Sequence, residues 1–160
     1  MLCEEESAPP KPLKVIVEGN QKTKRSVILR EAGLTSAEIP SGGIDPAKIA
    51  QSLQNTHLFS KVDVSVEDEA EETVVHIRVK ERWTLIPVPV FSTREEETGG
   101  GLYILEPNLL GYKKLILFGA TFTDVGERYQ AIFLDDALFG SKFQLFLRAA
   151  NMHALRVRYE

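Results

Sequence analysis

The sequence has one cysteine, three histidines, one tryptophan and no apolar run of about 18 residues. The single thiol, Cys3, cannot form a disulfide within the chain or build a thiolate metal cluster. The lack of a long apolar run excludes a membrane-spanning helix but not a barrel, because barrel strands carry their apolar residues in alternation. A net charge of −4 offers no general attraction to nucleic acid or anionic lipid.

Residues 1–12 combine glutamate and proline without apolar periodicity, which predicts a disordered leader. Cys3 within it is either a lipidated cysteine or a free thiol in a disordered tail. Only Leu2 lies between Met1 and Cys3, so the apolar stretch of a signal peptide is missing.

Residues 13–82 carry the pattern of a two-layer domain, in the order strand, helix, helix, strand, strand. Asp45-Pro46 predicts the start of the second helix, because aspartate is a good N-cap and proline suits the first turn. Thr23 is the predicted N-cap of the first helix. In each strand apolar residues alternate with polar ones, so one face is expected to lie under the helices. The predicted inner residues are Val15, Val17, Ile28, Ile49, Leu53, Val62, Val64, Ile77 and Val79.

After Trp83 no helix signal appears, and about six short strands with polar turns are expected. Pro87 and Pro89 predict an edge position for the first of them. The run Gly99-Gly100-Gly101 is expected to give flexibility at a strand start. Strands of about ten residues joined by tight turns are typical of a transmembrane barrel, although a soluble antiparallel sheet alternates in the same way.

Several short motifs resemble those of one family. Val17-Glu18-Gly19-Asn20 resembles the end of the first strand of a POTRA domain, and Leu58-Phe59 with Val62 resembles that domain's passage from second helix to second strand. Asn108-Leu109-Leu110-Gly111 resembles the turn after the second strand of BamA/TamA-like outer-membrane barrels. The segment from Asp135 to Gly140 resembles a later turn of the family, in which proline usually stands at Asp136.

The resemblance implies an α+β POTRA domain (βααββ) over residues 13–82. It implies an all-β antiparallel meander over residues 83–160, the N-terminal part of an incomplete transmembrane β-barrel. Closed bacterial barrels begin at about eight strands, and an open sheet edge in lipid leaves backbone groups unpaired. The chain is therefore expected to be a fragment or truncated product. Trp83 is expected to anchor at the membrane interface or to fill the junction between domain and barrel.

No pattern for catalysis is found, so no enzyme activity, cofactor or metal is expected. His57, His76 and His153 are scattered without ligand spacing. Asp135 and Asp136 are strand neighbours that point to opposite faces. The glycine run lacks the lysine and the following helix of a phosphate loop.

The expected function rests on a free strand edge, which can bind an extended peptide through its backbone. The resemblance places residues 61–67 at such an edge, with Lys61, Asp63, Ser65 and Glu67 as the predicted partner-binding residues. Ser65 is expected to offer one of the docking N–H groups. The implied partners are unfolded outer-membrane proteins, assembly partners and outer-membrane lipid, with the POTRA domain in the periplasm. A rigid spacer, a two-partner secretion transporter, a barrel attached to a patatin-like lipase and a soluble binding protein remain alternatives.

Overall fold

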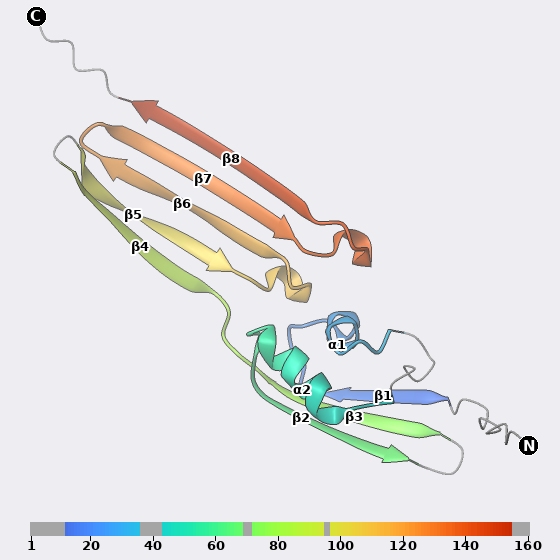
Figure 1. The fold of residues 1–160 in the computed structure, drawn as a ribbon. Coiled ribbons are helices and arrows are strands. Elements are labelled where there is room, and N and C mark those ends of the chain that lie inside the picture. The colour runs from blue at the N-terminus through green and yellow to red at the C-terminus, as the bar shows by residue number, and fades with distance from the viewer. Residues whose placement is uncertain (1–11, 36–42, 69–71, 95–96, 155–160) are drawn as a thin grey trace, which may run out of the picture. The chain divides into compact units, whose positions relative to one another are not determined.

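A computed structural model describes residues 12–35, 43–68, 72–94 and 97–154 (Figure 1). The predicted leader, with Cys3, lies outside these ranges except for Pro12. Contacts divide the chain after Arg82 into two compact units. The first contains β1 (Leu13–Glu18), α1 (Arg25–Glu31), α2 (Pro46–Asn55), β2 (Phe59–Asp68) and β3 (Thr73–Glu81). The second contains β4 (Ile86–Arg94), β5 (Glu97–Glu106), β6 (Leu115–Thr123), β7 (Gly126–Asp135) and β8 (Leu145–Ala154), with 3₁₀ turns at Leu109–Gly111 and Leu138–Gly140.

The strands of the first unit form a sheet in the order β1-β3-β2. β1 lies parallel to β3, an arrangement that needs a crossover connection, and α1 and α2 lie in that connection. β2 lies antiparallel to β3, with a bulge between Phe59 and Lys61. Since β3 is the middle strand, β1 and β2 each have one free edge in this sheet.

One apolar core joins the two helices to one face of this sheet. All the predicted inner residues belong to the core or pack against it, which confirms that prediction. Ile28 and Leu53 from the helices and Val75 and Ile77 from β3 have no exposed surface. The helices therefore cover one sheet face, and the alternate side chains of β2 and β3 point away from them.

The two helix starts differ from each other. Asp45 caps α2 as predicted, since its Oδ1 accepts hydrogen bonds from the N–H groups of Ala47 at 2.9 Å and Lys48 at 3.3 Å. The predicted cap of the first helix, Thr23, is wrong: α1 begins at Arg25 with Lys24 as N-cap and no side-chain cap bond. Thr23 is instead buried, and its N–H donates to Glu81 Oε1 at 2.6 Å.

The loop between β1 and α1 is fixed to the end of β3. Glu81 accepts a second hydrogen bond from the Lys22 N–H at 2.8 Å. Gly19 opens the loop with a φ of 85°, and a Cβ at this position would overlap the Val79 carbonyl oxygen. The glycine of the predicted strand-ending turn is therefore required both by its backbone conformation and by its approach to β3.

The pKa of Glu81 gives a testable pH dependence. Partial burial acts to raise this pKa, but the hydrogen bonds from the Thr23 side chain and from the Thr23, Lys22 and Gln21 backbones outweigh it and lower the pKa below 4.5. A carboxyl with a lowered folded-state pKa stabilises the fold above its unfolded pKa, and this stabilisation is lost as pH falls through the folded value.

We expect Glu81→Gln to lower the free energy of unfolding at neutral pH by about 1 kcal/mol, because the amide replaces only part of the acceptor capacity. The difference from the parent protein should shrink as pH falls through the folded pKa of Glu81. Urea denaturation of both proteins across acidic and neutral pH measures it. A difference that stays constant with pH would show that the ionised carboxyl does not fix the loop.

The second unit is a five-stranded antiparallel sheet in the order β4-β5-β6-β7-β8. All five strands named from the sequence form, and β4 lies at an edge as its prolines predict. The expected total of about six strands exceeds the five found in the described part of the chain. The glycine run is not a flexible start: Gly99, Gly100 and Gly101 lie inside β5 and pair with both β4 and β6.

Candidate functional site: a free strand edge and an apolar sheet face

The predicted partner-binding residues lie on β2, an edge strand. The side chains of Lys61, Asp63, Ser65 and Glu67 are exposed on the face opposite the helices, while Val62, Val64 and Val66 turn toward the core. The exposed row carries both charges, and His76 Nε2 lies 3.9 Å from Glu67 Oε2. These four side chains thus flank the free edge.

The backbone groups of β2 follow a different alternation from its side chains. In a middle strand, successive residues direct their backbone groups to opposite neighbours. The Thr73 N–H donates to the Pro12 carbonyl beside β1, so Thr73, Val75 and Ile77 bond toward β1, and Val74, His76 and Arg78 bond toward β2. The β2 partners of this second set are Glu67, Ser65 and Asp63.

The backbone groups of Asp63, Ser65 and Glu67 are therefore used inside the sheet. The expectation that Ser65 offers a docking N–H is wrong, because its N–H faces His76 on β3. The groups that face outward belong to Val62, Val64 and Val66. Among the described residues, no hydrogen bond outside the ladder reaches the backbone of these three valines.

The other edge of this sheet is partly covered. The Val15 carbonyl of β1 points away from β3 and accepts a hydrogen bond from Arg25 Nη2 at 2.8 Å. Arg25 opens α1, so the crossover itself places a side chain over the middle of the β1 edge. An incoming strand would have to displace that contact, and β2 is the more accessible edge.

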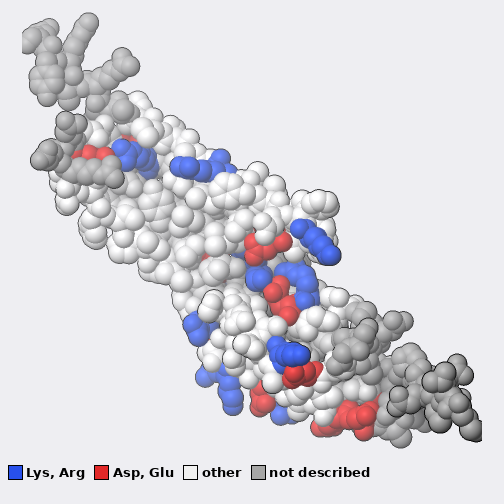
Figure 2. Space-filling view, viewed as in Figure 1, with Lys and Arg blue, Asp and Glu red and all other residues white. Residues whose placement is uncertain are grey.

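The five-stranded sheet has two faces of different chemistry. One, the apolar face, exposes large side chains, including Phe91 with 82% of its surface accessible. Glu127, Asn151 and His153 share this face at one end of the sheet. Its apolar members include Pro89, Phe91, Leu102, Ile104, Ile116, Phe118, Ala120, Phe122, Tyr129, Ala131, Phe133, Leu147 and Ala149. Much of the surface of this unit visible in Figure 2 belongs to neither basic nor acidic residues.

The opposite face mixes polar side chains with apolar ones such as Leu117 and Ile132. The Arg128 guanidinium pairs with Glu97 at 3.0 Å, and the Tyr103 and Thr121 hydroxyls lie 3.3 Å apart. Side chains at Gly101 and Gly119 would overlap the carbonyl oxygens of neighbouring strands. The strands therefore approach one another closely on this glycine face, which indicates that the sheet curves toward it.

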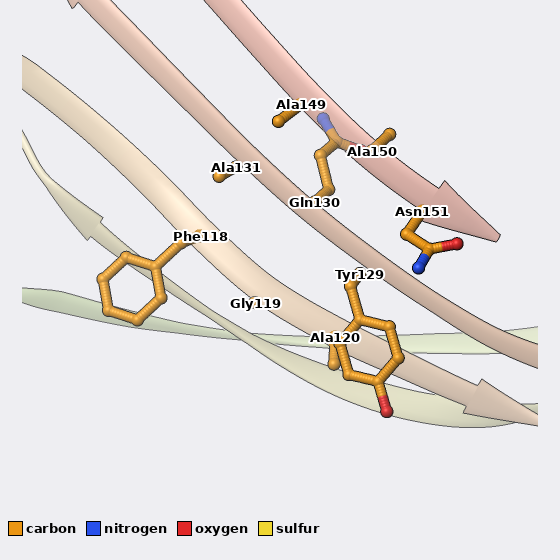
Figure 3. Close-up of a pocket in the computed structure, with 9 residues that line it drawn as sticks. All are labelled: Phe118, Gly119, Ala120, Tyr129, Gln130, Ala131, Ala149, Ala150 and Asn151. Carbon is orange, nitrogen blue, oxygen red and sulfur yellow. The ribbon is translucent and has the colours of Figure 1, made fainter.

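A shallow groove of about 550 Å³ lies along β6, β7 and β8 (Figure 3). Ala120, Ala131 and Ala149 leave the space open, and Phe118 and Tyr129 stand beside it. Tyr129 also meets Phe122 edge-on, with ring centroids 6.0 Å apart. The lining is alanine and aromatic rather than a set of convergent polar groups, so the groove has apolar packing chemistry.

The remaining candidates from the sequence do not come together. Nowhere in the described ranges do three or more His, Cys, Asp or Glu side chains gather as metal ligands would. Asp135 is buried against Lys114, whose Nζ lies 3.0 Å from its Oδ2, while Asp136 is exposed in the turn. Neither described helix has the length and apolar character needed to cross a membrane.

Comparison with known proteins gives a sequence relative and solved structures of similar fold. No family model matches the chain. The outer membrane protein assembly factor BamA of Nitratidesulfovibrio vulgaris is 29% identical over 142 residues, which cover 85% of this chain and 14% of that protein. The crystal structure of BamA from Haemophilus ducreyi lacking POTRA domains 1–3 matches 88% of this chain and 27% of its own, with a TM-score of 0.67 and 16% identity. CdiB from Acinetobacter baumannii matches 78% of this chain and 26% of its own, with a TM-score of 0.50 and 11% identity.

Proposed function

We propose, from the similarity of this chain to BamA in sequence and fold, that it belongs to the BamA/TamA-like outer-membrane assembly family and works in the assembly or translocation of outer-membrane proteins. In this proposal the first unit is a periplasmic POTRA domain, and residues 83–160 are the N-terminal part of an outer-membrane β-barrel. The role is binding and guidance rather than catalysis, and it needs no cofactor.

The free β2 edge carries the proposal. Val62, Val64 and Val66 direct backbone N–H and C=O groups away from β3, so an extended polypeptide can add to the sheet there. Main-chain pairing is tolerant of sequence, which suits a protein that meets many unfolded outer-membrane polypeptides or assembly partners. The mixed charges of Lys61, Asp63 and Glu67 beside the edge favour no single side-chain pattern.

The two faces of the second unit support its place in a barrel wall. The apolar face has the composition expected toward lipid, and the glycine face has the polar pairs and curvature expected toward a barrel interior. The meander order with tight turns is the connectivity of such barrels. An aqueous role for the same sheet would leave the apolar face in water.

The β2 edge can be tested with proline at a position whose N–H faces outward. Val66→Pro removes one docking donor without breaking the β2–β3 ladder, whereas Val66→Ala keeps the donor and matches the loss of side-chain packing. We expect Val66→Pro to weaken binding of an unfolded barrel-strand peptide by about tenfold relative to Val66→Ala, the equivalent of one hydrogen bond. Peptide titration of the residue 12–82 unit measures this, after amide spectra confirm that each variant is folded.

Ser65→Pro serves as the counterpart, because its N–H lies inside the ladder. The Ser65→Pro substitution should destabilise the first unit itself, so a loss of peptide binding in this variant would not report on the docking edge. Equal peptide affinities of the folded Val66→Pro and Val66→Ala variants would exclude this edge as the docking site and favour a spacer role.

The fold of this chain is similar to that of CdiB as well as to that of BamA. A second candidate function is therefore the transport of one dedicated substrate. The same titration separates the two. Similar affinities for several unrelated barrel-strand peptides favour assembly, and strong preference for a single sequence favours dedicated transport.

A further inference from the structure

Two turns of the second unit share one geometry. In the β5–β6 turn, Leu109 N–H donates to the Lys114 carbonyl at 2.9 Å, and Gly111 N–H donates to the Asn108 carbonyl at 3.0 Å. The β7–β8 turn repeats both bonds, from Leu138 to Phe143 at 2.9 Å and from Gly140 to Ala137 at 2.8 Å. In each, the carboxylate that ends the preceding strand, Glu106 or Asp135, accepts the N–H two residues on.

The residue at the tip of each turn has a large, apolar and exposed side chain and a left-handed backbone conformation. Leu110 has φ 54° and 72% of its surface accessible; Phe139 has φ 53° and 97% accessible. Left-handed backbone strains such residues, and glycine or asparagine would relieve both the strain and the apolar exposure. The exposed tip side chain takes no part in the hydrogen bonds that hold either turn, which come from the backbone, from Glu106 or Asp135, and from Asn108 or Ser141. Because the same costly arrangement occurs in both turns, we infer that the two tip side chains have a binding role.

Both tips lie at the same end of the sheet, where other apolar, aromatic and basic side chains are found. The turns are two strands apart, which is about 10 Å. Ile86 of β4 pairs with Leu105 at this end, and Trp83, 81% exposed, comes just before it. Tyr112 and Phe143 are also exposed here, and Lys113 and Lys142 follow the two tips.

We propose that Leu110 and Phe139 are paired anchors that enter the headgroup–acyl boundary of a lipid bilayer at this end of the sheet. The inference rests on the proposed contact of the apolar face with lipid. Tryptophan and tyrosine favour the headgroup level, and lysine suits anionic headgroups. Glu106 and Asp135 are buried, which leaves Asp136 as the exposed acid of the two turns. Apolar tips with aromatic and lysine side chains beside them match the composition of a membrane interface.

The test uses a single tryptophan as a depth reporter in the full chain. With Trp83 replaced by phenylalanine, Phe139→Trp reports the turn tip and Phe118→Trp reports the middle of the apolar face. Each protein is diluted from urea into vesicles of phosphatidylethanolamine and phosphatidylglycerol that carry bromine either near the headgroup or deep in the acyl chain.

We expect the tryptophan emission of both variants to shift to shorter wavelength when vesicles are added. The two bromine positions should quench the two variants to opposite extents. Headgroup-proximal bromine should quench Phe139→Trp more strongly, and deep bromine should quench Phe118→Trp more strongly. If Phe118→Trp is quenched and Phe139→Trp is not, the anchor inference fails alone. If neither is quenched, the proposed lipid contact of the apolar face fails, and the anchor inference fails with it.

Substitution separates anchoring from a structural role. Leu110→Asn with Phe139→Asn should lower the vesicle-bound fraction in flotation, while leaving hydrogen-exchange protection of β5–β8 in detergent unchanged or higher, because asparagine accepts the left-handed backbone. A loss of protection would assign the tips to folding and overturn the anchor role.

Discussion

Replacement of Ile77 by alanine is expected to lower the free energy of unfolding of the first unit by about 2–5 kcal/mol. Ile77 lies in the middle strand β3, has no exposed surface and belongs to the core that joins the helices to the sheet. Neighbours on both sides of β3 restrict collapse around the deleted methyl groups, so much of the cavity should remain. Urea denaturation of the residue 12–82 unit measures the loss.

Ser65→Ala is the matched control, since Ser65 is exposed on the adjacent strand and its side chain faces away from the core. Its effect should stay within about 0.5 kcal/mol. A loss near zero for Ile77→Ala would mean that the strand faces are assigned backwards and that the helices cover the other side of the sheet.

The alternation of apolar and polar residues in the sequence was sufficient to predict the helices and strands. The predictions that failed concern positions fixed by contacts between residues far apart in the chain. The Asp45-Pro46 signal is local, and the helix starts there because cap and donors are a few residues apart. The start of α1 depends on a carboxylate far along the chain: Glu81 holds the Thr23 N–H, and the helix begins two residues later. The residues next to Thr23 in the sequence do not reveal this contact with Glu81.

The candidate site shows a second limit. Side-chain alternation in residues 61–67 is readable from the sequence and places Ser65 on the exposed face. The direction of each backbone N–H depends on which residues of β3 bond to β1, and the contact from Thr73 to Pro12 fixes that. The exposed side chains and the outward backbone groups therefore belong to alternate residues, and a binding variant chosen from side-chain exposure tests the wrong position.

The glycines of β5 lead to the second large expected effect. Gly101→Ala should lower amide protection of β5 and β6 by about 100-fold, equivalent to about 3 kcal/mol. A Cβ at Gly101 would overlap the carbonyl oxygen of Ala120 on the glycine face, so the two strands must move apart or change their curvature. Hydrogen exchange of the full chain in detergent micelles, resolved strand by strand, measures the change.

Gly100→Ala is the control one residue away in the same strand. Its Cβ would point to the apolar face and meet the Val90 carbonyl oxygen at 3.3 Å and a flexible Phe91 ring at 3.4 Å, so a shift of a few tenths of an ångström accommodates it. Protection should then change by less than about tenfold. Equal losses for the two variants would show that glycine is needed in β5 for backbone flexibility, as the sequence alone suggested. A loss confined to Gly101→Ala would show that the close approach of β5 and β6 on the glycine face sets the curvature of the sheet.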